Sequence, residues 1–364
     1  MRERRVLLTG AGGIGGVNFV RSLRLAENHY NERFFIVGTD FNTYYIELPE
    51  VDLRFRAPRH TSADFIPTLI KLATSNKLEF LHPHPSPEAK VVSENREKFE
   101  ELGVTLYLPR PEDIMPDKFH VYRKLSSAGV NVPKTIHVKL VDDVDAAFAE
   151  LDKPLWIRAM KGAGGRLSLK VNSPEEAKMW IKLNVVQGRA RQDEFIIQEY
   201  LPGRDLAFDS LWFKGELITS YLRERLEYPF KHISLSGLTG TPSVARILRD
   251  ENVSRIAISA VKALNPSPHG FYSVDLKEGA DGLPKVTEVD GKWHTTAPLW
   301  GYAFAKAYNK PSYNIAYTYL RLGYGEGVSE ALPKTDLFLE EHYLIRQMDS
   351  GVVLKSKERS YRVV

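Results

Sequence analysis

Apolar residues in the first third of the chain form short continuous runs that alternate with stretches of helical spacing. Four runs have the length and composition of buried strands: Val6 to Thr9, Phe34 to Gly38, Leu78 to Leu81 and Val104 to Leu108. Three stretches between them have helical spacing: Val17 to Leu25, Phe65 to Ala73 and Glu88 to Leu102. This alternation favours a parallel sheet with helices on both faces, so we predict a Rossmann-like α/β domain over residues 1–115.

The pattern changes after PRPEDIMPDK, a segment with three prolines that we interpret as a linker. Residues 116–200 are predicted to form a small α+β unit, with one helix from Phe119 to Ala128 and another opened by Asn172-Ser173-Pro174-Glu175, which offers a cap and a proline in the first turn. Its predicted strands are VNVPKTIHV, Trp156 to Ala159, Leu167 to Val171 and Glu194 to Tyr200.

Residues 201–330 are predicted to form a larger, strand-rich α+β unit. Strand patterns extend from Leu206 to Val289, with turns at Lys214-Gly215 and Asp281-Gly282 and one helix from Ser254 to Leu264. Residues 331–364 form a C-terminal extension, in which we expect a helix and a hairpin after Leu337.

Composition narrows the class of protein. A chain of 364 residues with 43% hydrophobic content is expected to form two or three domains. The net charge is only +4, and basic residues are interleaved with acidic ones, which favours small-molecule substrates over nucleic acid. There is no cysteine, which excludes disulfides, thiolate nucleophiles and cysteine-ligated zinc. No apolar run approaches the roughly 20 residues of a membrane-spanning helix, so we expect a soluble, cytoplasmic enzyme.

A GxGxxG motif follows the first predicted strand and opens a helix, with Gly10, Gly12 and Gly15 as its glycines and Asp40 at the end of the next strand. In this context the motif can hold a pyrophosphate on a helix N-terminus while the acid binds a ribose hydroxyl. The motif alone leaves an alternative equally open, in which the glycines only permit a tight turn and close helix packing.

A second glycine-rich segment joins two predicted strands. Arg158 ends the first strand, and the loop Lys161-Gly162-Ala163-Gly164-Gly165-Arg166 follows it. The glycines let backbone N–H groups close over a phosphate, while Arg158, Lys161 and Arg166 neutralise its charge. A mobile surface hairpin is the alternative.

Three acidic residues lie near the ends of two predicted strands joined by the Asp281-Gly282 turn. Asp275 can lie across from Glu288, and Glu288 and Asp290 share one strand face because side chains alternate. Converging carboxylates repel unless a hard cation lies among them, and magnesium takes carboxylates together with phosphate oxygens. We therefore predict a Mg²⁺ site at these three acids, with Mn²⁺ as the alternative ion. The competing interpretation is an acidic hairpin facing solvent.

The strand that ends at Gln198-Glu199-Tyr200-Leu201 can offer backbone groups to an adenine edge, with Glu199 or Asp205 for its polar atoms. By itself this segment favours a plain core strand followed by a turn.

A candidate acceptor pocket contains Arg223 and Arg225, which are two positions apart on a predicted strand and can clamp a carboxylate. We group with them Lys231, the run from Ser236 to Gly240, and His294-Thr295. A charged strand face explains the two arginines equally well.

Taken in this order, these segments resemble the ATP-grasp superfamily, in particular its carbamoyl-phosphate-synthetase-like and biotin-carboxylase-like branch. The resemblance covers about Arg5 to Trp293. It implies a Rossmann-like preliminary domain followed by two α+β subdomains that hold ATP between them. It also implies ligation of a carboxylate to an amine or similar nucleophile through an acyl phosphate, and an N-terminal glycine loop that normally binds no nicotinamide.

The resemblance also implies roles for individual residues. Asp117-Lys118 is similar to the DK that starts the grasp domain, which makes Lys118 a phosphate ligand, and Arg158 is similar to the basic residue before the glycine loop. Gln198 to Leu201 resemble the adenine hinge. Asp275, Glu288 and Asp290 resemble the metal-binding acids of an E-x-N-x-R pattern. Two positions depart from that pattern: Asp290 stands where asparagine is usual, and Lys292 where arginine is usual.

We therefore expect an ADP-forming, carbon–nitrogen bond-forming ligase that uses ATP, a small carboxylate and an amine-type substrate. Lys118, Arg158 and Lys161 are expected to take up phosphoryl charge, and Lys292 and Arg225 are candidate catalytic residues beside them. Two other functions stay open: a nicotinamide-dependent oxidoreductase built on the GxGxxG motif, and a non-catalytic ATP-binding protein. The oligomeric state is also open, a homodimer included.

Overall fold

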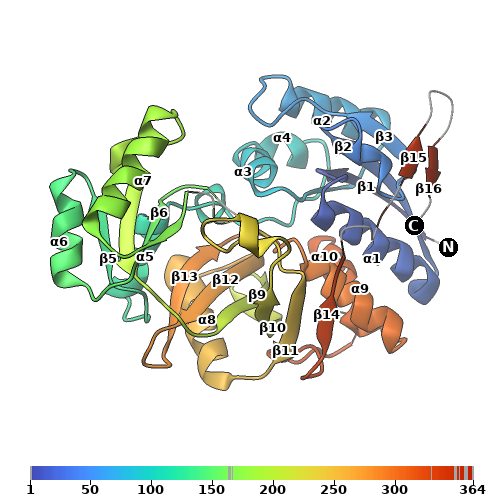
Figure 1. The fold of residues 1–364 in the computed structure, drawn as a ribbon. Coiled ribbons are helices and arrows are strands. Elements are labelled where there is room, and N and C mark those ends of the chain that lie inside the picture. The colour runs from blue at the N-terminus through green and yellow to red at the C-terminus, as the bar shows by residue number, and fades with distance from the viewer. Residues whose placement is uncertain are drawn as a thin grey trace.

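The computed structural model describes residues 2–162, 165, 167–328, 330–347, 351, 353–355 and 360–362. Its N-terminal unit is a parallel sheet in the order β3-β2-β1-β4 (Figure 1). The elements of this unit are β1 (Arg2–Thr9), α1 (Ile14–Tyr30), β2 (Glu32–Asp40), η1 (Tyr45–Glu47), β3 (Leu53–Arg56), α2 (Phe65–Ser75), β4 (Phe80–Pro83), α3 (Ser86–Glu94) and α4 (Arg96–Glu100).

The apolar run in β1 is continuous because both faces of the sheet are covered. Val6 and Leu8 belong to a core that includes residues of α1, whereas Leu7 belongs to a second core with residues of α2, α3 and α4. The predicted parallel sheet with helices on both faces is therefore confirmed.

Two local predictions in this unit are wrong. Residues 104–108 form no strand, because only Thr105 bridges to Phe80 while the apolar side chains of this segment fill the two cores. The single helix expected from Glu88 to Leu102 is interrupted at Asn95 and forms α3 and α4. The pattern also missed β3, an edge strand whose four residues are all exposed and therefore carry no apolar run.

The glycines of the GxGxxG motif are required for close packing in this structure. A Cβ atom at Gly15 would lie 1.8 Å from Nε2 of His84, and one at Gly10 would lie 2.0 Å from Cγ of Pro85. The carboxylate of Asp40 is also engaged, because it accepts hydrogen bonds from the backbone N–H groups of Gly12 (3.1 Å) and Asn42 (2.8 Å). These contacts favour the packing interpretation of the motif over dinucleotide binding.

The second unit is an antiparallel sheet in the order β5-β8-β6-β7. Two helices of this region begin at a side-chain cap. Asp117 accepts from Phe119 N (2.9 Å) at the start of a helix that packs against the third unit, and Ser173, within the predicted run Asn172 to Glu175, accepts from Glu176 N (3.3 Å). The elements are α5 (Lys118–Ser127), β5 (Thr135–Val138), α6 (Asp142–Glu150), β6 (Leu155–Ala159), β7 (Leu169–Val171), α7 (Pro174–Val186) and β8 (Phe195–Glu199).

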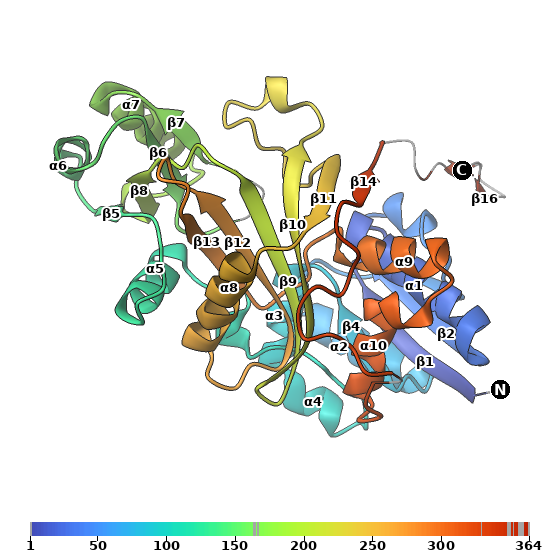
Figure 2. The ribbon, with the colours of Figure 1, turned by 90° about the horizontal axis from the view of Figure 1, so that it is seen from below.

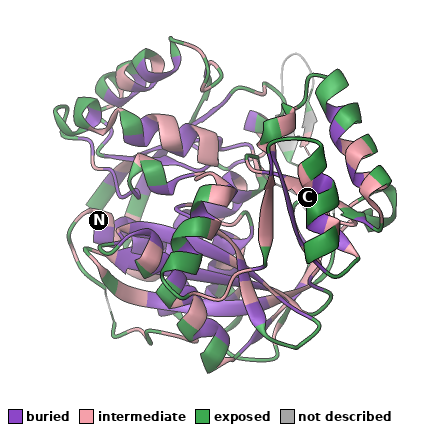
Figure 3. Ribbon diagram, turned by 90° about the vertical axis from the view of Figure 1, so that its left-hand side faces the viewer, coloured by how far each residue is buried: buried purple, intermediate pink, exposed green. Residues whose placement is uncertain are grey.

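The third unit is a six-stranded antiparallel sheet in the order β13-β12-β9-β10-β11-β14. Figure 2 shows α8 on one side of this sheet and two later helices, α9 and α10, on the other. The elements are β9 (Asp205–Phe213), β10 (Glu216–Glu227), β11 (Val244–Leu248), α8 (Glu251–Leu264), β12 (Gly270–Glu278), β13 (Pro284–Asp290), α9 (Ala297–Ala307), α10 (Ile315–Gly323) and β14 (Tyr343–Ile345). Figure 3 shows that its strands are largely buried. Together the three units confirm the predicted fold class.

The segment interpreted as a linker is docked onto the third unit. Asp113 is buried, and its carboxylate accepts hydrogen bonds from Asn265 (2.6 Å) and Tyr272 (2.7 Å). Its backbone oxygen accepts from Gly291 N (2.7 Å). The segment is therefore held against β12 and the end of β13 in the third unit rather than joining the units loosely.

After β13 the chain returns to the N-terminal unit before it adds β14 to the third sheet. Both α9 and α10, which the sequence analysis did not predict, pack against α1 (Figure 1). Among the described residues after Leu337 there is no helix, so that expectation is wrong there, but β15 (Val353–Lys355) and β16 (Ser360–Arg362) form the expected hairpin. None of the described helices combines the length and apolar content needed to cross a bilayer.

Glu88 is a buried acid on α3 that lies close to Gly10 of the GxGxxG motif. It is 5% exposed, and among the described residues its Oε2 atom has no hydrogen-bond partner. Burial, and then repulsion from Asp40, raise the pKa of Glu88 from 4.5 to about 7. The folded state therefore favours the neutral carboxyl.

Glu88→Gln is expected to make the free energy of unfolding less dependent on pH. The stabilisation from a carboxyl with a raised folded-state pKa is complete below its unfolded pKa and is lost as pH rises through the folded value, here from 4.5 to about 7. The shift corresponds to a loss on the order of 3 kcal/mol. Urea unfolding at about pH 4.5 and about pH 8.5 should show that the variant gains on the wild type at the higher pH.

The matched control is Glu94→Gln on the same helix, where the side chain is exposed. An equal difference between Glu88→Gln and wild type at both pH values would contradict the pKa assignment.

Candidate functional site

A cavity of about 560 Å³ lies between the second and third units. Its lining brings together residues that are far apart in the sequence, and Ser86 of the N-terminal unit also reaches it. The predicted site residues in the lining are Lys118, Arg158, Lys161, Gly165, Gln198, Glu199, Tyr200, Leu201, Asp205, Arg225, Asp275, Glu288 and Lys292. Asp290 does not line it, and Gly164, with Ala163 and Arg166, lies outside the described residues.

Two cations meet an acid of the third unit: Arg158 comes from β6 of the second sheet, and Lys118 comes from α5, which packs against the third unit. Glu288 Oε2 lies 3.2 Å from Nη2 of Arg158 and 3.5 Å from Nζ of Lys118. Lys118 is the first residue of α5, and its ammonium also donates to the backbone oxygen of Gly162 (2.6 Å), which places it at the start of the glycine loop. Burial, and the neighbouring Arg158 and Lys292, lower the pKa of Lys118 against the opposing effect of Glu288.

Asp275 and Glu288 face each other across the hairpin as predicted, because they are register partners in the β12–β13 pair. Burial alone would raise the pKa of Glu288, but Lys292, Lys118 and Arg158 more than offset it and hold the pKa at about 2. Asp275 lies 2.5 Å from Nη2 of Arg225 and 3.0 Å from Nε2 of His294. Both carboxylates are therefore ionised at neutral pH and face the cavity.

Asp290 has different surroundings from the other two acids. It is 3% exposed, its Oδ1 accepts from the backbone N–H of Met115 (2.8 Å), and its Oδ2 lies 2.7 Å from Nζ of Lys292. Lys292 also lies 3.3 Å from Glu288 Oε1. In this arrangement Asp290 holds Lys292 and the docked segment in place rather than facing the cavity.

A divalent cation fits the pair Asp275 and Glu288 better than the predicted trio. Among the residues that the structure describes, no group of three or more His, Cys, Asp or Glu side chains is arranged to hold a metal ion. Two ionised carboxylates across a hairpin suit magnesium only if phosphate oxygens complete its coordination.

The far end of the cavity is lined by a connected set of half-buried polar side chains. Arg225 contacts Asp205 (3.2 Å) as well as Asp275, and His294 Nδ1 lies 2.6 Å from Asp209. Arg223 does not reach the cavity, because it is buried and donates to Asp209 (3.0 Å). Of the predicted acceptor residues, the lining contains Arg225, Ser236, Leu238, Thr239, Gly240, His294 and Thr295, but not Lys231.

The opposite end is lined by the predicted hinge. Glu199 is already paired with Lys285 (2.8 Å) and accepts from Lys134 N (2.7 Å). Trp156 and Tyr200 add aromatic surface here, with their ring centroids 6.4 Å apart. The sequence analysis missed Trp156, although alternation along β6 puts it on the same face as Arg158. It also missed Tyr228, for which the sequence carries no comparable signal.

The middle of the chain matches a known protein family. Residues 115–296 match the family model described as ATP-grasp domain. The chain is 26% identical over 181 residues to a glutamate–LysW ligase of Sulfurisphaera tokodaii, which covers 49% of this chain and 61% of the relative. It is 24% identical over 179 residues to D-alanine–D-alanine ligase B of Clostridium perfringens, covering 48% and 56%. The chain thus matches less than two thirds of either relative's length.

Solved structures share the fold over more of the chain. The biotin carboxylase domain of Hydrogenobacter thermophilus 2-oxoglutarate carboxylase, solved with magnesium ADP and bicarbonate, has a TM-score of 0.68 at 16% identity, covering 93% of this chain and 73% of that one. The L-amino acid ligase of Bacillus licheniformis has a TM-score of 0.62 at 15% identity, covering 92% and 78%.

Asp290→Ala is expected to lower the free energy of unfolding by about 3 kcal/mol or more, because it leaves buried Lys292 without its nearer partner and Met115 N without an acceptor. Asp290→Asn keeps an acceptor for Met115 N and should cost less. Urea unfolding measures both losses, with Asp152→Ala, at an exposed position, as the control. A loss of unfolding free energy for Asp290→Ala no larger than that of the control would contradict the structural role of Asp290.

Proposed function

Because the chain belongs to the ATP-grasp family, we propose that it is an ADP-forming ligase that activates a carboxylate with ATP and joins it to an amine or similar nucleophile. The observation that carries this proposal is the meeting of Arg158, from the second sheet, and Lys118, at the start of α5, with Glu288 of the third sheet. Cations and acids line the same cavity, which suits a nucleotide phosphate chain bound together with a cation.

On this proposal, Lys118, Arg158 and Lys161 bind the phosphate oxygens of ATP. The charges that Lys118 and Arg158 now share with Glu288 would pass to the phosphates. Asp275 and Glu288 would then hold Mg²⁺, or Mn²⁺ in its place, which neutralises charge that develops on the phosphoryl oxygens. The hinge and the rings of Trp156 and Tyr200 provide a site for the base.

The proposed reaction has two steps. A carboxylate oxygen of the substrate attacks the γ-phosphorus of ATP and ADP leaves; the amine nitrogen then attacks the acyl carbon and phosphate leaves. Arg225, and Lys292 near Glu288, are positioned to stabilise the negative charge of the carboxylate and of the leaving phosphate.

Acyl phosphates hydrolyse, so the cavity must exclude water during this reaction. Gly165 lies close enough to the third unit that a Cβ atom there would be 2.9 Å from Cβ of Leu238. Gly165 therefore meets the segment of residues 236–241 at the cavity, and we propose that the cavity closes at this contact.

An amino acid is the first substrate class to test. The two curated relatives are named as ligases of glutamate and of D-alanine, and a solved neighbour is named as an L-amino acid ligase. A nicotinamide-dependent reaction has no comparable support, because the GxGxxG glycines are taken up by packing against His84 and Pro85.

ADP release in the presence of Mg²⁺ and ATP is expected to depend on both a carboxylate and an amine. Pools of amino acids, amines and bicarbonate, tested singly and in pairs, identify the combination, with coupled detection of ADP and separate detection of AMP. ATP binding without turnover in any pair would refute the ligase, and binding of NADH but not ATP would favour an oxidoreductase.

Glu288→Ala is expected to abolish turnover, a loss of at least about 100-fold, because the variant loses a proposed ligand of the cation. Glu150→Ala, at an exposed position at the end of α6, should keep wild-type turnover. Circular dichroism and the thermal midpoint establish that both variants fold. Unchanged turnover in a folded Glu288→Ala protein would overturn the metal assignment.

A further inference from the structure

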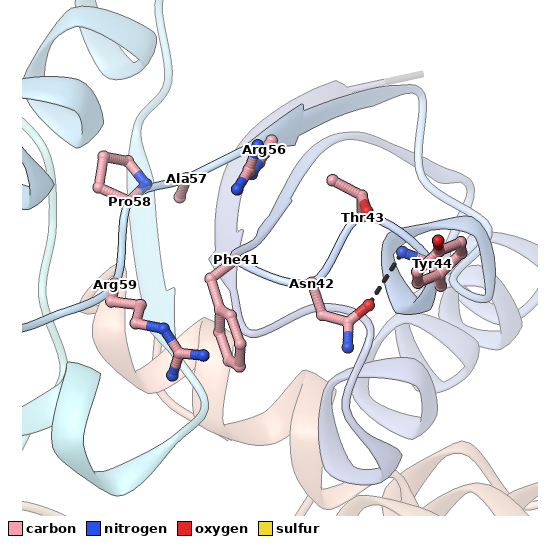
Figure 4. Close-up of a pocket in the computed structure, with 8 residues that line it drawn as sticks. All are labelled: Phe41, Asn42, Thr43, Tyr44, Arg56, Ala57, Pro58 and Arg59. Carbon is pink, nitrogen blue, oxygen red and sulfur yellow. Dashed lines mark hydrogen bonds between the residues drawn. The ribbon is translucent and has the colours of Figure 1, made fainter.

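A second cavity, of about 520 Å³, lies on the N-terminal unit at the carboxyl ends of β2 and β3 (Figure 4). Residues 41–44, which follow β2, form one wall, and Arg56 to Arg59, at and after the end of β3, form the other. The carboxyl edge of a parallel sheet is where ligands bind in open α/β folds, because loops from neighbouring strands diverge there.

The walls of this cavity are fixed by hydrogen bonds that surround Asp40. Its carboxylate accepts from Gly12 N and Asn42 N, and its backbone oxygen accepts from Ala57 N (3.0 Å). Asn42 in turn accepts from Tyr44 N (2.9 Å), as Figure 4 shows. One residue therefore ties both walls together, so the cavity is formed before any ligand binds.

The cavity carries two positive charges that the described part of the chain does not neutralise. Neither Arg56 nor Arg59 has a carboxylate partner among the described residues, and the guanidinium of Arg59 stacks over the ring of Phe41 at 4.2 Å. Arg54, two positions earlier on β3, differs: it donates to the backbone oxygens of Ile46 (3.2 Å) and Pro49 (2.8 Å) and supports the fold. The contrast indicates that Arg56 and Arg59 are free to bind an anion.

Aromatic surface accompanies this charge. Phe41 is 40% exposed and Tyr44 is 79% exposed, both in the lining, and Asn42 and Thr43 add polar atoms. The volume exceeds the needs of a single phosphate and falls in the range of small-molecule sites, roughly 300–1,000 Å³. The combination suits a molecule with an anionic group and a flat ring.

This cavity is separate from the proposed ATP site. The sheet order β3-β2-β1-β4 places Ser86, which follows β4 and lines the ATP cavity, beyond β1 from the second cavity. Three strand spacings of about 4.8 Å separate β3 from β4, or about 14 Å. The two cavities share no lining residue.

We propose that this cavity binds a nucleoside monophosphate or a closely similar ring-bearing phosphate. Arg56 and Arg59 pair with the phosphate, for which the planar guanidinium is suited, and Phe41 and Tyr44 contact the base. The site stands whether or not the ATP cavity performs the proposed ligation.

The test is isothermal titration with UMP and with GMP while a saturating non-hydrolysable ATP analogue and Mg²⁺ fill the first cavity. We expect at least one monophosphate to bind, and Arg56→Gln/Arg59→Gln to weaken its binding at least 10-fold. Phe41→Ala should weaken the monophosphate more than it weakens inorganic phosphate. The charge-matched control, Arg33→Gln/Arg255→Gln, replaces exposed arginines at the opposite end of β2 and on α8 and should bind like wild type.

Three results would overturn the proposal: no binding of either monophosphate, equal binding to the Arg56/Arg59 variant, or inorganic phosphate binding as tightly as the monophosphates. Because the variant residues are exposed, thermal midpoints near wild type are expected for all of these proteins. ADP release by Arg56→Gln/Arg59→Gln under the ligase assay should be unchanged, which separates this site from the first.

Discussion

The contact of Glu288 with Lys118 and Arg158 is the interaction on which the proposed ATP cavity depends. Arg158 and Glu288 form an ion pair between two sheets that share no strand, and Lys118 approaches the same carboxylate from α5. Partly buried charges of this kind are costly unless each has a partner, and this cost keeps the three groups together. An entering phosphate chain offers the two cations a stronger partner, while a cation offers one to Glu288. On the proposed function, a nucleotide and its cation can therefore replace the contact of Glu288 with Lys118 and Arg158 without leaving any of these three charges unpaired.

The other charged side chains next to Glu288 also have partners. The contacts run from Arg223 on the buried side of the sheet through Asp209, His294, Asp275 and Arg225 to Asp205 at the cavity. Burial would raise the pKa of Asp275, but Arg225 and His294 hold it well below its usual range. If a cation takes Asp275, Arg225 loses one of its two acidic partners and gains capacity for a substrate carboxylate. Binding of the nucleotide would then prepare the site for the second substrate, by a redistribution of charge that needs no large movement.

The sequence predicted the fold well where a local pattern had a local cause. The run Val6 to Leu8, the cap at Ser173 and the turn at Lys214-Gly215 all appear as expected, with Lys214 and Gly215 both at positive φ. It failed where tertiary packing decided the outcome. Residues 104–108 are apolar because they fill two cores, not because they pair, and β3 pairs without any apolar pattern because it lies at an edge.

For the site too, the sequence predicted what depends on local pattern and failed where distant segments decide. Arg158, Lys118 and the Asp275–Glu288 pair could be placed from motifs, because strand alternation and hairpin register determine which side chains face each other. The engagement of Asp40 by Gly12 and the direction of Asp290 could not, since each depends on a segment distant in sequence. Arg56 and Arg59 could not be singled out either, because their lack of a carboxylate partner among the described residues depends on segments distant in sequence.

The two departures from the family's usual E-x-N-x-R pattern have one physical explanation in this structure. Lys292 is a point charge, whereas arginine can span two carboxylates with its fork. The ammonium lies 2.7 Å from Asp290 and 3.3 Å from Glu288, so the acid at position 290 supplies the charge that holds a lysine in place. An asparagine there would offer only a neutral oxygen to a buried ammonium. The acid and the lysine are thus a matched pair, and the carboxylate of Asp290 pairs with Lys292 rather than joining the proposed cation site.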